Sequence, residues 1–269
     1  MTKTIFITGT SSGLGKGTAI LFARRGWNVI ATMRDPSKET ELNTIPGIQV
    51  LALDVTDAAQ VNETIASLLR TTPVDVVVNN AGYGLGGPFE GATEEQLQRQ
   101  IDTNLMGVFR VTQAFIAHFR NRKSGVFITI TSIGGHVAFP IFAPYHATKW
   151  ALEGWSESLW YELSRFGIQV KTVAPGGIRS DFGGRSLTLT SHPAYDELME
   201  GAEKVMRAPK RLANYASPEA IAEVIYTAAT DGKPQLRYIA GKGAKMMYRI
   251  RNLFGYRFFM KQVNKMFFS

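Results

Sequence analysis

The chain has 269 residues, of which 45% are hydrophobic and 19% are charged, a composition and length that fit a globular protein with a sizeable core. Cysteine is absent, which excludes disulfides and thiolate metal sites, and no apolar run is long enough to cross a bilayer. The net charge of +8 is uneven, because residues 241–269 hold seven of the 30 basic residues and no acid; the 23 basic residues that remain face 22 acidic ones, so the body of the protein is not expected to bind nucleic acid.

The first predicted element is a short buried strand at residues 4–8. No signal peptide precedes it, so we expect a cytoplasmic protein. Residues 9–15 then read Gly-Thr-Ser-Ser-Gly-Leu-Gly, and an apolar helical face follows. A strand, a glycine-rich loop and a helix in this order favour a dinucleotide site, since Gly9 can take a turn conformation and Gly13 and Gly15 let the backbone approach a pyrophosphate. The alternative is a tight turn whose glycines serve packing alone.

Short apolar runs alternate with longer helical patterns along the rest of the body. We predict further strands at residues 27–33, 48–53, 74–79, 125–131, 168–174 and 236–239. Helices are predicted at residues 57–70, 94–119, 144–166 and 217–229. This alternation predicts an α/β fold in which a doubly wound parallel sheet of about seven strands is covered by helices on both faces. We expect one domain over residues 1–240 and a separate tail over 241–269.

A second glycine-rich segment at residues 82–87 also has the spacing G-x-G-x-x-G. It follows the strand predicted at 74–79, but Pro88 and Phe89 come next in place of a helix. Because the match lacks the helix that a phosphate loop requires, we interpret this segment as a flexible loop beside the site.

Thirteen positions after Ser132 comes Tyr145, and Lys149 follows four positions later. Residues four apart share one face of a helix, so the phenol and the ammonium can point into one site. A nearby cation favours the phenolate and lowers the pKa of a tyrosine, which can then exchange a proton near neutral pH. The pair alone is a weak signal and gains weight from the dinucleotide loop.

Together these motifs resemble the short-chain dehydrogenase/reductase family in its single-domain form, over about residues 1–240. The resemblance rests on the 8–15 loop, Asn-Asn-Ala-Gly at 79–82, Asn104 in Asn-Leu-x-Gly, the Tyr145 and Lys149 pair, and Pro-Gly at 175–176. It implies a Rossmann fold and a nicotinamide cofactor. The cofactor site it implies comprises Gly9, Ser11, Ser12, Gly13, Leu14, Gly15, Arg34, Asp54, Val55, Asn80, Ala81, Gly82, Tyr145, Lys149, Pro175, Gly176 and Ile178.

The resemblance also implies catalytic roles. Tyr145 would donate the proton to a carbonyl or accept it in reverse, Lys149 would lower its pKa and bind the ribose hydroxyls, Ser132 would hold the substrate oxygen, and Asn104 would hold a water behind Lys149. During hydride transfer, negative charge would build on the substrate oxygen, and the hydroxyls of Ser132 and Tyr145 would stabilise and protonate it. No metal is needed, and the four histidines are scattered.

These residues also have simpler structural interpretations. Ser132 can cap a strand end, Asn104 can serve as a hydrogen-bonding residue of its helix, and Asp54 can cap its own loop instead of contacting the adenine. His146 points about 100° away from Tyr145 on a helix, so we interpret it as structural.

The end of the second strand, Met33-Arg34-Asp35, bears on the choice of cofactor. An acid at the strand end binds the ribose 2′-hydroxyl of NAD, whereas a cation there suits the 2′-phosphate of NADP. By family analogy the acid position is Met33, and Arg34 can fork onto a phosphate. We therefore predict NADP(H) over NAD(H), against the alternative in which Asp35 binds the ribose.

Three segments are expected to line the substrate side, and their apolar residues favour an apolar or aromatic substrate. They offer Tyr83, Leu85, Phe89, Val137, Phe139, Ile141, Phe142, Phe182 and Leu187, any of which can instead be core. Residues 177–215 suggest a mobile lid, in which Ser180 stands where the family usually has Thr. The basic, apolar-rich tail can pack over the lid or a neighbouring subunit, lie on an anionic membrane, or remain disordered.

The sequence thus predicts an NADP-preferring oxidoreductase that interconverts an apolar or aromatic ketone or aldehyde with an alcohol, as a homodimer or homotetramer. The alternatives are a non-catalytic NADP-binding sensor and a peripheral membrane protein that acts through its basic tail. A sugar-nucleotide epimerase of the extended branch would need a C-terminal substrate domain, for which 269 residues leave little room.

Overall fold

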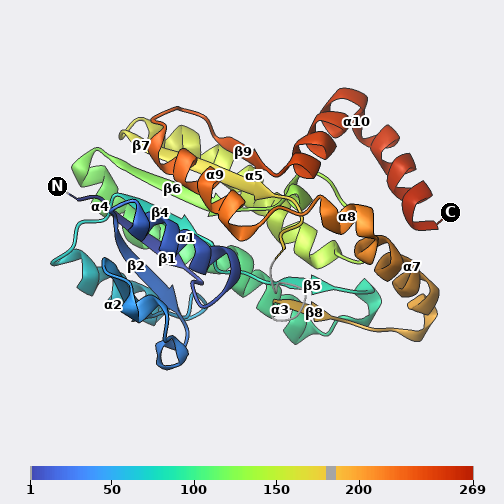
Figure 1. The fold of residues 1–269 in the computed structure, drawn as a ribbon, viewed down its shortest axis with the longest axis horizontal. Helices are drawn as coiled ribbons and strands as arrows, with labels where there is room; N and C mark the ends of the chain where they lie inside the picture. The colour runs from blue at the N-terminus through green and yellow to red at the C-terminus, as the bar shows by residue number, and fades with distance from the viewer. Residues whose placement is uncertain (1, 180–185, 269) are drawn as a thin grey trace.

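A computed structural model describes residues 2–179 and 186–268 (Figure 1). Its centre is a seven-stranded sheet in the order β3-β2-β1-β4-β6-β7-β9, and every neighbouring pair is parallel. The strands are β1 (Thr4–Thr8), β2 (Asn28–Met33), β3 (Ile48–Ala52), β4 (Val76–Asn79), β6 (Gly125–Ile130), β7 (Ile168–Pro175) and β9 (Arg237–Ala240). The predicted doubly wound parallel sheet is confirmed, and each predicted strand lies within two residues of the observed one at both ends.

Helices cover both faces of the sheet because successive residues of each buried strand point to opposite sides. On one face, α1 (Gly13–Arg24) and α9 (Pro218–Thr230) pack together over Ile5 and Ile7 of β1. On the other, α2 (Ala58–Leu69), α4 (Gly107–Arg122) and α5 (Ala143–Ser164) pack over Phe6. The chain therefore has two apolar layers, one on each side of a single sheet.

The helix predicted at 94–119 is interrupted in the structure. It divides into α3 (Glu94–Ile101), a π-helical turn at Asp102–Met106, and α4. Asn104 lies in the π-helical turn, and its side chain bonds the backbone of Tyr83. π-Turns inside helices often mark functional positions, and this one points a buried amide toward the segment that follows β4.

The prediction of a flexible loop at residues 82–87 is wrong. Gly84–Gly86 forms β5, which pairs in parallel with β8 (Leu187–Leu189), and its residues are buried. The glycines are required by close approach: a Cβ on Gly86 would lie 2.9 Å from the Phe142 ring, and one on Gly87 would lie 2.3 Å from the Thr190 carbonyl oxygen. The segment is thus a buried strand that packs closely against Phe142 and Thr190.

The segment expected to form a lid contains β8, α7 (Asp196–Arg207) and the short α8 (Pro209–Ala213). The tail forms α10 (Lys242–Phe268), whose helix is broken at Gly255, where φ is 74° and ψ is 177°. After the break α10 packs on α7, with Phe267 against Ala202, and on the body, with Phe259 in a cluster that includes Val137 and Phe139. Ser180 and Phe182, which the sequence singled out, lie outside the described residues.

Candidate active site

A cavity of about 2290 Å³ opens at the carboxyl ends of the parallel strands, where doubly wound folds bind their ligands. The segments that follow β1, β3, β4, β6 and β7 all contribute to its wall. Every cofactor-site residue named from the sequence lines it, and so does Ser132. Asn104 is not in the wall; it is buried behind it.

The glycine loop is shaped as a cradle for a phosphate group. Gly9 and Gly13 have φ of 70° and 57°, which other residues rarely adopt. A Cβ on Gly15 would lie 2.2 Å from the Gly9 carbonyl oxygen, and one on Gly9 would lie 2.8 Å from the Ala81 Cα. The Asn80 amide donates to the carbonyl oxygens of Thr8 and Gly9 at 2.9 Å and holds the loop in place. With the N-terminus of α1 directed at this space, the residues fit a dinucleotide pyrophosphate.

The two candidates for contact with the adenosine ribose differ in their availability. The Asp35 carboxylate accepts from the Ser37 backbone and hydroxyl and pairs with Lys38 at 3.0 Å. These hydrogen bonds, that of Ser37 above all, hold the pKa of Asp35 below its usual value. Arg34 is exposed and lines the cavity, and no ion pair holds it within the described ranges. The structure therefore leaves the guanidinium, and not the carboxylate, free to meet a ligand.

Asp54 lines the cavity but is also committed to its own loop. One of its carboxylate oxygens accepts from the Thr56 backbone at 2.9 Å and from the Thr56 hydroxyl at 2.7 Å. The capping role considered for this residue is what the geometry shows, although the side chain remains at the cavity wall.

Ser132, Tyr145 and Lys149 meet at the inner end of the cavity. Ser132 follows β6, whereas Tyr145 and Lys149 lie one turn apart on α5. The Tyr145 phenol is hydrogen-bonded to the Ser132 side chain. The Lys149 ammonium is buried, donates to the Ile130 carbonyl oxygen at 2.8 Å, and lies 5.8 Å from the centre of the Tyr145 ring. Two hydroxyls and a cation thus surround one point in the cavity.

The pKa values in this cluster differ from the sequence-based expectation. Burial raises the pKa of Tyr145, and its hydrogen bond with Ser132 opposes this rise. The lowered pKa expected for the phenol is therefore wrong for the protein's own groups, because desolvation outweighs the hydrogen bond with Ser132. Burial lowers the pKa of Lys149 to about 8, against the opposing charge of Glu153.

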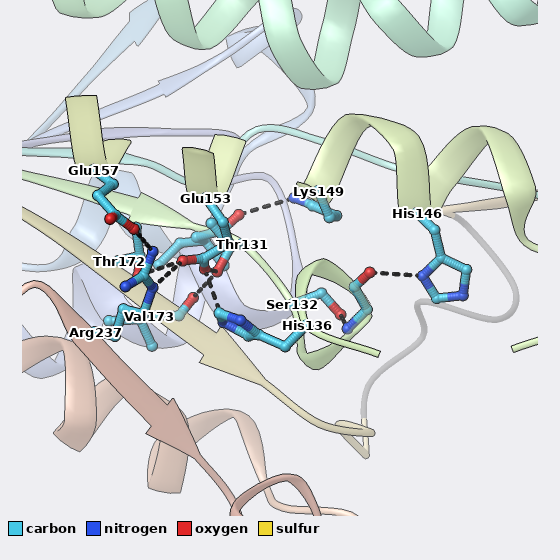
Figure 2. Close-up of polar contacts among 12 residues, drawn as sticks. Thr131, Ser132, His136, His146, Lys149, Glu153, Glu157, Thr172, Val173 and Arg237 are labelled. Atoms are coloured by element: carbon cyan, nitrogen blue, oxygen red, sulfur yellow. Dashed lines mark hydrogen bonds and ion pairs between the residues drawn. The ribbon is translucent and has the colours of Figure 1, made fainter. Parts of the chain in front are cut away.

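Glu153 is a buried acid that the sequence interpretation missed. Its carboxylate accepts from Thr131 at 2.6 Å and from Arg237 at 3.0 Å, and it lies 3.3 Å from the His136 ring (Figure 2). Burial raises the pKa of Glu153, but contacts with His136, Thr131 and Arg237 outweigh it and hold the pKa below its usual value. The available signal was its spacing, since Glu153 comes four residues after Lys149 and so lies on the same helix face.

The side chains of Asn104 and His146 both hydrogen-bond to backbone groups. The Asn104 amide accepts from the Tyr83 backbone N–H at 3.0 Å and donates to the Tyr83 carbonyl oxygen at 2.8 Å. His146 accepts from the Phe139 N–H, so its other ring nitrogen donates to the Gly134 carbonyl oxygen at 2.8 Å. Burial lowers the pKa of His146. The structural interpretation of His146 therefore agrees with the geometry, and the ring fixes the loop after Ser132.

The outer part of the cavity is rich in methionine and aromatic residues, and α7 also contributes the charged residues Asp196, Glu200, Glu203 and Arg207. Of the residues expected there, Tyr83, Phe139, Phe142 and Leu187 line the wall. Leu85, Val137 and Ile141 are buried core instead, and Phe89 is exposed outside the cavity. The sequence interpretation missed the methionines that α7 and α10 contribute, namely Met199, Met206, Met246, Met247 and Met266. Met side chains adapt to differently shaped ligands.

No group of His, Cys, Asp or Glu side chains within the described residues is arranged to hold a metal ion. None of the helices in the described part of the chain is both long and apolar enough to traverse a bilayer.

Comparison with known sequences shows the family to which the chain is related. A family model described as short chain dehydrogenase matches residues 3–188. The chain is 34% identical over 278 residues to the uncharacterized oxidoreductase YusZ of Bacillus subtilis (strain 168), which covers 99% of both chains. It is 32% identical over 251 residues to retinol dehydrogenase 8 of Bos taurus, covering 87% of this chain and 80% of that protein.

Two solved structures also match most of the chain. A crystal structure of a short-chain dehydrogenase from Streptomyces avermitilis matches with a TM-score of 0.86 and 32% identity, and covers 98% of this chain and 97% of that one. ElxO with NADP bound matches with a TM-score of 0.73 and 27% identity, over 89% of this chain and 98% of that one.

Proposed function

The chain belongs to the short-chain dehydrogenase/reductase family of NAD(P)-dependent oxidoreductases, and from this premise we propose that it reduces an apolar or aromatic ketone or aldehyde, or oxidises the corresponding alcohol, with NADP(H) preferred. The observation that carries the proposal is the hydrogen-bonded Ser132 and Tyr145 pair beside the Lys149 ammonium, at the end of a cavity that begins at the glycine loop.

The proposed mechanism assigns one task to each side chain. The glycine loop and Lys149 would hold a nicotinamide cofactor, which would supply the hydride in reduction and accept it in oxidation. The Ser132 hydroxyl donates a hydrogen bond to the carbonyl oxygen, and the Tyr145 phenol gives that oxygen its proton. The Lys149 ammonium stabilises the phenolate that remains and holds the ribose hydroxyls. Asn104 acts by fixing the Tyr83 backbone at the cavity wall.

The raised pKa of Tyr145 favours its role as an acid. Because burial disfavours the phenolate, Tyr145 carries its proton at neutral pH and can donate it to a carbonyl oxygen. The positive charge of Lys149 is present below about pH 8, so the two groups are in the required protonation states together at neutral pH.

The preference for NADP rests on Arg34. Its guanidinium lines the cavity, while Asp35 is held by Ser37 and Lys38. ElxO, to which the chain is similar, was solved with NADP bound. Steady-state kinetics with NADPH and NADH test the proposal, and a kcat/KM that favours NADH would reject it.

The proposed substrate class rests on the aromatic and methionine-rich outer cavity, together with the similarity to retinol dehydrogenase 8. A screen of NADPH oxidation over aromatic ketones, retinoids, steroids and short β-keto esters tests it. Faster turnover of charged or sugar substrates than of apolar ones would contradict the class. We also propose a homodimer or homotetramer, since Ile101, Met106, Trp150 and Tyr161 on α3–α5 and the turn between them are exposed.

A further inference from the structure

Five large side chains project from the bend of α10. Leu253, Phe254, Tyr256, Phe258 and Met260 are 76%, 56%, 53%, 39% and 62% exposed, and we call them the apex patch. Contiguous exposed apolar side chains of this size are uncommon on a soluble surface and mark contact with another phase or partner. Exposure on both sides of Gly255 shows that the apex patch is not the face of α10 that packs on the protein.

The packing face of α10 is separate and already covered. After the bend, Phe259, Val263 and Phe267 follow one another at intervals of four residues and contact α7 and Phe139. Arg257, Lys261 and Lys265 repeat at the same interval and are exposed. The outward side of the second half of α10 is therefore a row of cations bordered by apolar side chains.

The break at Gly255 puts the apex patch at a corner of the molecule. The two halves of α10 meet there at an angle and project away from the sheet (Figure 1). A Cβ built on Gly255 meets no atom within 4 Å, so there is open space beside the bend.

From these observations we propose that the apex patch and its cations dock the protein onto an anionic membrane surface. The apolar side chains would enter the boundary between headgroups and acyl chains, while Arg251, Arg257 and Lys261 contact lipid phosphates. This inference goes beyond the oxidoreductase activity and does not depend on it.

Charge is what selects an anionic bilayer over a second copy of the chain. A two-fold contact places the same patch of both subunits together. With seven basic residues and no acid in residues 241–269, such a contact would set cations against cations. A bilayer offers many negative groups and adapts to the irregular shape of the apex patch.

Docking would also bring one wall of the cavity close to the bilayer. Met246, Met247 and Met266 of the same helix line the cavity. The wall formed by α10 would therefore lie close to the lipid phase.

The test is co-sedimentation of the full chain with vesicles of phosphatidylcholine alone and with vesicles that contain phosphatidylglycerol. We expect binding only to the anionic vesicles and release by high salt. Arg257→Gln/Lys261→Gln should lower the partition coefficient by roughly 25-fold, since each cation contributes about fivefold. The matched control Arg120→Gln/Arg165→Gln removes two exposed cations from α4 and the end of α5 and should bind like the unmodified chain.

A second pair of variants tests the apolar part. Phe254→Ser should weaken binding, whereas Phe89→Ser, which removes a comparably exposed aromatic ring elsewhere, should not. The proposal is overturned if the unmodified chain ignores anionic vesicles, or if both charge variants lose binding equally. It is also overturned if Phe254→Ser converts an oligomer to a monomer in the absence of vesicles, because the apex patch would then be a subunit contact.

Discussion

Glu153 lies one helical turn after Lys149, and its charge opposes the fall that burial causes in the Lys149 pKa. The carboxylate is fixed by Thr131, Thr172 and Arg237 (Figure 2), so it cannot turn away. It therefore helps to keep Lys149 charged at neutral pH, although it lies outside the cavity wall.

Removing the charge of Glu153 should shift the pH dependence of reduction. The active form needs charged Lys149, so kcat/KM falls as pH rises through about 8, the pKa of that ammonium. Glu153→Gln removes an opposing negative charge, which lowers this pKa and moves the fall to lower pH. A pH profile of kcat/KM measures the change.

Glu157→Gln is the matched control for this substitution. Glu157 also pairs with Arg237, but it is half-exposed and lies one turn farther from Lys149. We expect its profile to match that of the unmodified enzyme. If Glu153→Gln lowers the melting temperature and leaves the profile in place, the role of Glu153 is structural alone.

Tyr145→Phe should abolish turnover without loss of cofactor binding. The phenol supplies the proton, and loss of a general acid costs about 10²- to 10⁴-fold in rate. The ring that lines the cavity is retained, so the Kd for NADPH from fluorescence titration should change little. Tyr161→Phe, on the exposed side of the same helix, is the control. Full turnover by the Tyr145 variant would reject the proposed acid and favour a sensor on the same fold.

Arg34→Ala should reduce the preference for NADPH. A charge-assisted contact with a phosphate contributes about 1.5–3 kcal/mol, so kcat/KM with NADPH should fall roughly 10- to 100-fold while the value with NADH stays nearly constant. Lys38→Ala removes a nearby cation that is already paired with Asp35 and should leave kcat/KM with NADPH unchanged. Equal losses with the two cofactors in Arg34→Ala would point to a structural effect.

The sequence predicted those features that depend on local pattern. The apolar runs from 4–8 to 236–239 each became a strand of the parallel sheet, because a strand buried on both faces needs continuous apolar residues. The spacing of Tyr145 and Lys149 predicted their shared helix face, because residues four apart lie on the same side of a helix. The loop at 9–15 was recognisable because only glycine fits its backbone and contacts.

Features that depend on distant partners were not predictable in this way. The pairing of Gly84 with Leu187 joins segments about a hundred residues apart, and nothing in the run Gly-Tyr-Gly-Leu-Gly-Gly indicates a strand partner. The π-helical turn places Asn104 against the backbone of Tyr83, 21 residues away along the chain, and the methionines of the cavity wall come together from α7 and α10. The raised pKa of Tyr145 follows from burial, which sequence spacing does not give.

Gly15→Ala gives the sharpest test of the glycine loop, because a matched glycine lies two residues away on the same helix. A methyl group at Gly15 would lie 2.2 Å from the Gly9 carbonyl oxygen and 2.5 Å from the Asn80 amide nitrogen. The loop must shift to admit it, at a cost of about 1–3 kcal/mol, and the cradle for the pyrophosphate opens. At Gly17 the nearest atom is 3.6 Å away, on Pro218, so alanine there fits and should stabilise α1 by about 0.5–1 kcal/mol. Gly15→Ala should therefore lower the melting temperature and weaken NADPH binding. Gly17→Ala should raise the melting temperature and leave NADPH binding unchanged. Thermal unfolding and NADPH titration measure these two effects. Equal affinities would mean that the loop does not hold the cofactor phosphates.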